Sequence, residues 1–312
     1  GRIGWNIVTS YLESAARNGL GELLEHDERY ERAEEYMDVC YKLWEQSWDD
    51  DAFVLDAEND VLVDPARVRK INHHGKYFAV EGPHMCAPTI QRTPYLVQAG
   101  QSPRGYAFGA KHAEALFVVF QNRHKAAEGV AKVRALEAAN GRGSGAVKFM
   151  QGVGVVVAET QQELELKVAR YKGYAAIEGL LALFGGWTGI DLAGFRPEDE
   201  IGAFDSNHIK QFAAFFAEID PQKRWTFAEV CEYMKLASIT PLIAGTPTQV
   251  ADELELWIDE GGVDGFNLIV VPELQRRGRV QADYGATGLS LRERFNGAGN
   301  TRLPPQHRAK QV

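Results

Sequence analysis

The sequence predicts an α/β fold built on a parallel sheet, and two observations carry this prediction. Five apolar segments rich in β-branched residues are separated by segments with the periodicity of amphipathic helices. Near-continuous apolar strands that alternate with helices are typical of parallel sheets, whose faces are covered by the helices. The five expected strands are residues 2–9, 93–99, 115–120, 147–157 and 265–271. They suit either an open doubly wound sheet or the last five strands of a (β/α)8 barrel.

The start of the chain favours the barrel. The segment from Gly1 to Ser10 begins in mid-strand, with no Met and no polar lead-in. Because an apolar strand needs a partner at a sheet edge, we expect an N-terminally truncated TIM barrel with strands 4–8 present, forming one domain over residues 1–312. The loss of three strands would leave two apolar edges, so we expect these residues not to be a functional enzyme by themselves.

Side-chain spacing and capping residues place the helices. Residues 28–48 repeat aromatic and apolar side chains every three or four positions, which predicts a long amphipathic helix. Ser102-Pro103 and Thr246-Pro247 are each typical of an N-cap followed by the first helical residue. A helix is expected at 103–112 and another at about 124–139. The other expected segments are an irregular stretch at 49–92 with a short hairpin near 76–80, a mostly helical stretch at 160–240, and an extended polar tail at 296–312.

Composition argues against several classes of function. The net charge of −9 disfavours a nucleic acid as the main partner, and no apolar run is long enough to span a bilayer. The three cysteines, Cys40, Cys86 and Cys231, form no CxxC pair and are expected to be reduced thiols in the cytoplasm. His73, His74 and His84 match no zinc spacing, so we expect solvated loop histidines and no metal site.

The turn between residues 99 and 105 has the features of an anion site. An apolar strand ends at Gly100, Ser102 stands at the N-cap position, and a helix-like run follows Pro103. A strand that turns directly into a capped helix points free backbone N–H groups and the positive end of the helix dipole at one place, which suits a phosphate monoester. An ordinary strand–turn–helix connection has the same spacing, so this pattern alone leaves both interpretations open.

Several motifs, in order along nearly the whole chain, together resemble one enzyme group. It is the branch of the bacterial-luciferase-like flavin monooxygenases that includes nitrilotriacetate monooxygenase component A and dibenzothiophene-sulfone monooxygenase. The motifs are Gly-Arg-Ile-Gly-Trp-Asn-Ile-Val-Thr-Ser at 1–10, His-Asp-Glu-Arg-Tyr at 26–30, Tyr-Met-Asp-Val-Cys-Tyr-Lys-Leu-Trp at 36–44, Ala-Gly-Gln-Ser-Pro-Arg-Gly at 99–105 and Gly-Trp-Thr-Gly-Ile-Asp at 186–191.

The resemblance implies an FMN-dependent, two-component monooxygenase on a luciferase-like barrel. A separate NAD(P)H:flavin reductase would supply reduced FMN, which would react with O₂ to a C4a-peroxyflavin and oxygenate a small organic substrate. The expected protein is a cytoplasmic flavoprotein and a homo-oligomer, with no nucleic acid or membrane partner. The rival interpretations are a deazaflavin-dependent oxidoreductase on the same barrel and a truncated, non-catalytic copy.

The resemblance also implies the site residues. The phosphate turn would use Ser102 and Gly105, with added charge from Arg104; the family usually has a second Ser where this chain has Gln101. His26 is the candidate for proton handling or a substrate contact, although helix capping is an equally plain interpretation. The flavin would further contact the strand-end residues and the start of the long helix, at Asn6, Thr9, Ser10 and Tyr30. The resemblance makes residues 160–240 a helical insertion or lid after the seventh strand. The part of it that closes over the flavin would include Trp187, Thr188 and Asp191.

Overall fold

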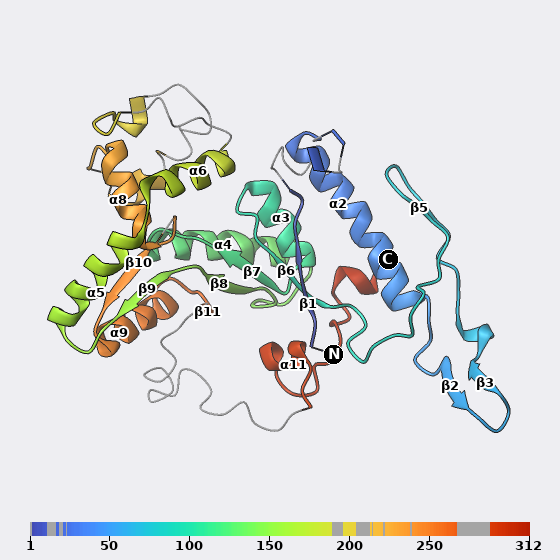
Figure 1. Ribbon diagram of the computed structural model, residues 1–312. Helices are drawn as coiled ribbons and strands as arrows, with labels where there is room; N and C mark the ends of the chain where they lie inside the picture. Colours follow the sequence, from blue (N-terminus) through green and yellow to red (C-terminus); the bar gives the residue numbers. More distant parts are fainter. Residues whose placement is uncertain are drawn as a thin grey trace. The chain divides into compact units, whose positions relative to one another are not determined.

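The computed structural model describes residues 2–10, 17–18, 21–22, 24–188, 196–203, 213, 215–220, 222–237, 239–266 and 288–312. The chain divides into two compact units (Figure 1). Unit 1 comprises Gly1–Leu116, Lys132–Lys148 and Tyr284–Val312, and unit 2 comprises Phe117–Ala131 and Phe149–Asp283.

The expected parallel sheet is present. Its strands run in the order β1-β6-β7-β8-β11, and all five lie within the segments that the sequence predicts. Pairing is parallel from β1 to β6, from β6 to β7 and from β8 to β11. This confirms the α/β class. The bounds are β1 Gly4–Ile7, β6 Tyr95–Gln98, β7 Ala115–Val118, β8 Lys148–Gln151 and β11 Gly265–Phe266; the rest of the expected last strand lies outside the described residues.

The helices of unit 1 form where the spacing predicts them. The long amphipathic helix is α2 (His26–Tyr41), which continues as a π-helical turn over Lys42–Gln46. The capped helix is α3 (Pro103–His112). Helix α4 spans Arg123–Ala139, and its residues from Lys132 onward belong to unit 1. One apolar core joins β1, β6, α2 and α3 to the C-terminal segment. It consists of Ile7, Tyr30, Met37, Tyr41, Leu96, Phe108, Leu303 and Ala309.

The irregular stretch at 49–92 contains two short antiparallel hairpins. The expected one is β4 (His73–His74) with β5 (Ala79–Val80), and the sequence analysis missed β2 (Phe53–Asp56) with β3 (Val61–Val63). A 3-10 turn follows at Pro65–Arg67. The expectation that His73 is solvated is wrong. His73 is buried, and both of its ring nitrogens contact side chains of α2 and the turn that follows it. Nε2 lies 3.1 Å from Glu35 Oε1, and Nδ1 lies 3.2 Å from Lys42 Nζ.

The C-terminal segment is not the extended polar tail that we expected at 296–312. Helix α11 spans Leu291–Asn296, and a 3-10 turn spans Arg308–Lys310. Between them, Leu303 and His307 are buried, and His307 Nε2 lies 2.9 Å from the His112 carbonyl oxygen. Leu303 and Ala309 belong to the apolar core of unit 1, which the composition of this polar segment did not reveal.

Unit 2 corrects the expectation of one strand at 147–157. The structure divides this segment into β8 and β9 (Gly154–Val157), and β9 pairs in parallel with β10 (Leu242–Gly245) in a separate two-stranded sheet. Strand β10 was not predicted from the sequence. The chain divides at Gly152, whose N–H donates to the Val118 carbonyl, whereas Gly154 N–H donates to Pro241.

The helices of unit 2 occupy much of the segment that the sequence predicts to be helical. They are α5 Gln161–Tyr174, α6 Ile177–Thr188 and α8 Phe227–Ala237, with a 3-10 turn at Ile201–Ala203. Helix α9 (Pro247–Asp259) begins with the expected Thr246 cap, as part of a capping box with Gln249. Among the described residues, no helix is long and apolar enough to cross a bilayer.

Candidate functional site

The predicted anion-binding turn of unit 1 forms at the N-terminus of α3. Ser102 has extended backbone angles (φ −67°, ψ 160°), and its Oγ accepts a hydrogen bond of 3.0 Å from the Gly105 N–H. Pro103 follows at the first helical position. A hydroxyl that accepts one hydrogen bond can still donate its proton, so Ser102 can cap the helix and contact an anion together.

Two glycines allow this turn to close. A Cβ on Gly105 would lie 2.8 Å from the backbone carbon and oxygen of Gly100, closer than real Cβ contacts come. A Cβ on Gly100 would lie 2.3 Å from Gln98 Nε2 and 2.5 Å from Tyr30 Oη. The strand end and the first helical turn therefore pack backbone against backbone, with side-chain donors of Gln98 and Tyr30 around them.

Helix α2 brings His26 and Tyr30 to the turn. The Nε2 atom of His26 lies 3.3 Å from Ser102 Oγ, and its Nδ1 lies 2.7 Å from Asp27 Oδ1. The Tyr30 side chain is only 4% exposed, because its ring packs between His26 and Phe108 with centroid distances of 5.3 and 5.6 Å. The first turn of α2 thus faces the first turn of α3, and four of the predicted site residues (His26, Tyr30, Ser102 and Gly105) meet.

The charge of Arg104 acts on a carboxylate of helix α2. Lys76 Nζ lies 3.2 Å from Glu31 Oε2, and this contact holds the pKa of Glu31 below its usual value, with a smaller contribution from the charge of Arg104. Arg104 is therefore close enough to α2 to affect a carboxylate there. Arg104 lies in the first turn of α3, and a role for its charge in binding an anion stays a prediction.

Three further predicted residues are Asn6 in β1 and Thr9 and Ser10, which follow that strand. Asn6 is exposed and pairs with Val97, on the opposite face of the strand from buried Ile7. Ser10 has a left-handed backbone, with φ +50°. Within the described part of the chain, no hydrogen bond joins the side chains of Asn6, Thr9 or Ser10 to Ser102.

The predicted lid residues belong to unit 2. Trp187 and Thr188 are the last two residues of α6, and Asp191 lies outside the described residues. A role for these residues as a lid stays a prediction.

Sequence reasoning missed Gln98, which lies directly beneath the turn. It is the last residue of β6, its side chain is 3% exposed, and its Oε1 has no hydrogen-bond partner among the described residues. One signal was available in the sequence: an amide side chain at the end of an otherwise apolar strand, two residues before a glycine turn.

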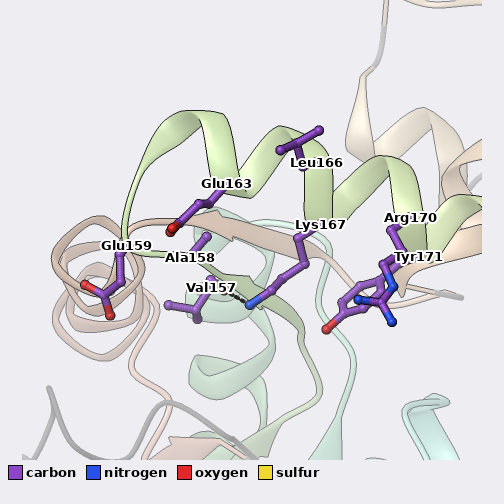
Figure 2. Close-up of a pocket in the computed structure, with 8 residues that line it drawn as sticks. All are labelled: Val157, Ala158, Glu159, Glu163, Leu166, Lys167, Arg170 and Tyr171. Carbon is purple, nitrogen blue, oxygen red and sulfur yellow. Dashed lines mark hydrogen bonds between the residues drawn. The ribbon is translucent and has the colours of Figure 1, made fainter.

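Unit 2 has a hollow of its own, of about 420 Å³, along α5 and the end of β9 (Figure 2). Lys167 crosses it, and its Nζ donates a hydrogen bond of 2.7 Å to the Val157 carbonyl. Glu163 and Arg170 also line the hollow, while Leu166 is 66% exposed. No predicted site residue lines it.

Comparison with known proteins places this geometry in a family. Residues 1–265 match the family model described as luciferase-like monooxygenase. The chain is 41% identical to the dimethyl-sulfide monooxygenase of Hyphomicrobium sulfonivorans, over all of this chain and 68% of that protein. It is also 41% identical to the long-chain alkane monooxygenase of Geobacillus thermodenitrificans, over 98% of this chain and 68% of that protein.

A relative and two solved structures extend the comparison. Nitrilotriacetate monooxygenase component A of Aminobacter aminovorans is 33% identical over 94% of this chain and 68% of its own length. The crystal structure of DmoA from Hyphomicrobium sulfonivorans covers all of this chain and 69% of its own, with a TM-score of 0.90 and 41% identity. A riboflavin lyase structure with modified FMN and riboflavin covers all of this chain and 71% of its own, with a TM-score of 0.86 and 30% identity.

These matches confirm the resemblance that the sequence motifs indicate, and the relatives agree in being named as monooxygenases. The fold is that of the luciferase-like proteins. The chain belongs to the luciferase-like monooxygenase family, in the branch that includes nitrilotriacetate monooxygenase component A.

Proposed function

We propose that this chain is the oxygenase of a two-component system and holds FMN by its phosphate at the Ser102 turn. The observation that carries the proposal is the meeting of Ser102, His26 and Tyr30 around the N-terminus of α3. A helix N-terminus with side-chain donors beside it is suited to a phosphate monoester. The riboflavin lyase neighbour, whose structure contains modified FMN, supports a flavin cofactor.

The donor chemistry of the turn fits a phosphate. Ser102 Oγ and Tyr30 Oη can each donate one hydrogen bond, and the Arg104 N–H lies in the first helical turn, where N–H groups lack partners within their own helix. Pro103 has no N–H, and the Gly105 N–H already donates to Ser102 Oγ. His26 Nε2 lies beside Ser102 and can donate when the imidazole is protonated. Arg104 adds charge that strengthens such bonds. We therefore assign His26 to the phosphate rather than to proton handling.

The C-terminal ends of β1 and β6 suggest where the flavin ring binds. Strands β1 and β6 are parallel, and Ile7 is paired with Gln98. Residues that follow these two strands therefore lie at one edge, as the C-terminal ends of parallel strands do. We place the ring of the flavin near Asn6, Thr9 and Ser10, whose amide and hydroxyl groups can hydrogen-bond its polar atoms.

In this function the bound flavin supplies the oxygen-activating chemistry, and the protein binds it, orients it and keeps water away. Reduced FMN would come from a separate NAD(P)H:flavin reductase. A segment at Trp187, Thr188 and Asp191 would close over the site. The substrate is a small organic molecule, the class to which the compounds named for the dimethyl-sulfide and nitrilotriacetate relatives belong.

The binding test compares FMN, riboflavin and FAD by titration of the full-length protein. We expect FMN to bind more tightly than either, because the turn recognises a terminal phosphate. Ser102→Ala should weaken FMN binding by about 1–2 kcal/mol, since a hydrogen bond to a charged group is lost, and should leave riboflavin unchanged. Thr246→Ala is the matched control, because it removes the corresponding cap hydroxyl before Pro247 on α9. Equal affinity for FMN and riboflavin would refute the assignment.

The activity test separates the oxygenase from an NAD(P)H oxidase. The chain alone should not oxidise NAD(P)H, since its sequence has no dinucleotide-binding Gly-x-Gly-x-x-Gly at a strand–helix turn. Oxygenation of candidate substrates should require a flavin reductase or chemically reduced FMN. Robust NAD(P)H turnover by the chain alone would contradict the proposal.

A further inference from the structure

The β2–β3 hairpin of unit 1 is an apolar ribbon whose side chains face water. Figure 1 shows it standing away from the helices of the same unit. Its exposed large side chains are Phe53, Val54, Leu55, Val61 and Leu62. Neighbouring residues of a strand point to opposite faces, so consecutive exposed residues leave both faces of the ribbon uncovered. Because a two-stranded hairpin is only marginally stable alone, an apolar surface of this kind indicates an interaction site.

The backbone of Leu55 is a second, independent indication. Its φ of +56° lies in the left-handed region, which a bulky side chain rarely adopts. The residue sits at the register shift between Phe53 and Asp56, and its side chain is 66% exposed. An unfavourable backbone that presents an apolar side chain to water points to binding rather than to packing within the chain.

Unit 1 also has an apolar hollow of about 200 Å³, hereafter the tryptophan hollow. Its lining includes Leu43, Trp44, Trp48, Cys86, Pro88 and Pro94. Trp48 Nε1 donates a hydrogen bond of 2.8 Å to the His84 carbonyl. Arg92 Nη1 donates to the Trp44 and Trp48 carbonyls, at 3.2 and 2.8 Å, so hydrogen bonds hold this wall in place. The hollow is smaller than the roughly 300–1,000 Å³ of most small-molecule sites, and it therefore suits side chains of a protein rather than a whole ligand.

The tip of the hairpin is acidic. No Lys, Arg or His stands between residues 50 and 67, and the tip carries Asp56, Glu58 and Asp60. In the described part of the chain, the ion pairs of this region join Arg67 to Asp51 and Asp64 at the base of the hairpin, and none reaches the tip. The tip therefore presents negative charge beside the exposed apolar side chains.

The surroundings of the tryptophan hollow have the opposite charge. The described residues that line it include Arg92 and no carboxylate. Arg92 and Arg302 both contact Asp50, so two guanidinium groups share one carboxylate. An apolar hollow with excess positive charge beside it matches an apolar ribbon with an acidic tip.

We propose that the β2–β3 hairpin is a docking arm that inserts Leu55 and Leu62 into the tryptophan hollow of a second copy of this chain. Each copy offers both the ribbon and the hollow, and the two are complementary in polarity and in charge. A reciprocal exchange of arms about a two-fold axis covers both ribbons, fills both hollows and closes the assembly as a dimer. The proposal does not depend on the proposed binding of FMN.

Cross-linking of the full-length protein tests which surfaces meet. Cys86 lines the hollow and is exposed, whereas Cys40 and Cys231 are buried. The double variant Leu55→Cys/Cys86→Ser is mixed with the original protein and treated with a short bis-maleimide, so that only a contact between copies can join position 55 to Cys86. Peptide mapping should identify this product. Its yield should exceed that of the control on the order of tenfold, because docking raises the effective concentration of the two thiols.

The control is Leu166→Cys/Cys86→Ser, because the Leu166 side chain is also 66% exposed and belongs to α5 of unit 2. The same two positions serve in a measurement of association by sedimentation velocity. Leu55→Asn should raise the dissociation constant of the dimer roughly tenfold or more, as for a central interface residue. The monomer should still fold, since Asn adopts the left-handed region more readily than Leu. Leu166→Asn should stay within about twofold of the original protein.

A charge reversal at the tip tests the electrostatic part. Glu58→Lys should weaken the dimer several-fold at low salt, and the difference should vanish near 1 M salt, where the Debye length is about 3 Å. A tighter dimer with Glu58→Lys would contradict the assigned hollow. A protein that stays monomeric at every concentration, or a dimer that Leu55→Asn leaves unchanged, would reject the docking arm. If Leu55→Asn weakens the dimer but position 55 does not cross-link to Cys86, the arm meets another surface and the pairing with the tryptophan hollow is rejected.

Discussion

At the scale of single residues, the notable feature is the contact between His26 and Ser102, which lie far apart in the sequence. Sequence reasoning treated His26 as a candidate for proton handling and Ser102 as a phosphate ligand. The distance of 3.3 Å between Nε2 and Oγ puts both on one turn. A histidine there can contribute charge and one hydrogen bond to an anion.

A substitution series at His26 distinguishes these roles. His26→Ala should weaken FMN by about 1–2 kcal/mol, as for a lost bond to a charged group, and should not change riboflavin binding. His26→Gln should retain part of the affinity, since its amide can still donate. The check is titration with both flavins, followed by the pH profile of oxygenation with reduced FMN. A changed pH profile with unchanged FMN affinity would show that His26 handles protons.

At the scale of elements, the connection from β6 to α3 depends on close backbone packing. Gly105 has no room for a Cβ, since the Gly100 backbone lies 2.8 Å from that position. Backbone atoms in a strand end and a helix start cannot move aside as a flexible side chain can. The glycine is therefore required by tertiary packing, although its backbone is ordinary helix.

This packing predicts opposite effects for two glycine-to-alanine changes. Gly105→Ala should destabilise the chain by about 1–3 kcal/mol, the range for overpacking, and should weaken FMN. Gly173→Ala, in α5, is the control: nothing lies within 4 Å of its Cβ position. It should raise stability by roughly 0.5–1 kcal/mol, because alanine favours helix over glycine. Urea unfolding of both variants checks this, and a stability of Gly105→Ala equal to that of the original chain would contradict the closed turn.

At the scale of the whole molecule, the C-terminal segment is tied to unit 1 by buried polar groups. Arg292 and Glu114 are 0% and 3% exposed, and Arg292 Nε lies 2.6 Å from Glu114 Oε1. His307 packs edge-on against Tyr41 and contacts the His112 carbonyl. Burial lowers the pKa of His307 to about 3, and it also lowers the pKa of His112.

The lowered pKa of His307 makes the free energy of unfolding fall as the pH falls. Because the pKa of His307 is lower in the folded state than its usual value near 6.5, protonation favours unfolding. The contribution of neutral His307 is complete above about pH 6.5 and is lost as the pH falls towards 3. Between pH 7 and pH 4.5, the free energy of unfolding should fall less in His307→Gln than in the original chain. The difference between the two should be at most about 1.4 kcal/mol per pH unit, the limit for one titrating group.

The comparison should use urea midpoints at several pH values. His124→Gln, at an 82% exposed side chain, is the control and should follow the original chain. Glu34 contacts His112 and Lys111, and these contacts lower its pKa to about 2. Its contribution to the free energy of unfolding is therefore lost only at a lower pH than that of His307. An acid dependence unchanged by His307→Gln would show that His307 does not anchor the segment.

The sequence by itself determined the elements whose causes are local. The cap formed by Ser102 and the one formed by Thr246 were predicted to the residue, because a cap joins groups three residues apart. The parallel sheet followed from apolar strands that alternate with helices. The order of motifs along the chain identified the family before any contact was known.

Only the tertiary structure decided which distant groups meet. It paired β9 with β10 across a helical segment, buried His307 against His112, and set Gln98 and Tyr30 around Gly100. Each of these contacts joins elements that are far apart in the sequence. Spacing within one turn of helix or within one strand carries no information on such long-range contacts. The Ser102 turn could therefore be located from the sequence, but the distant side chains that surround it could not.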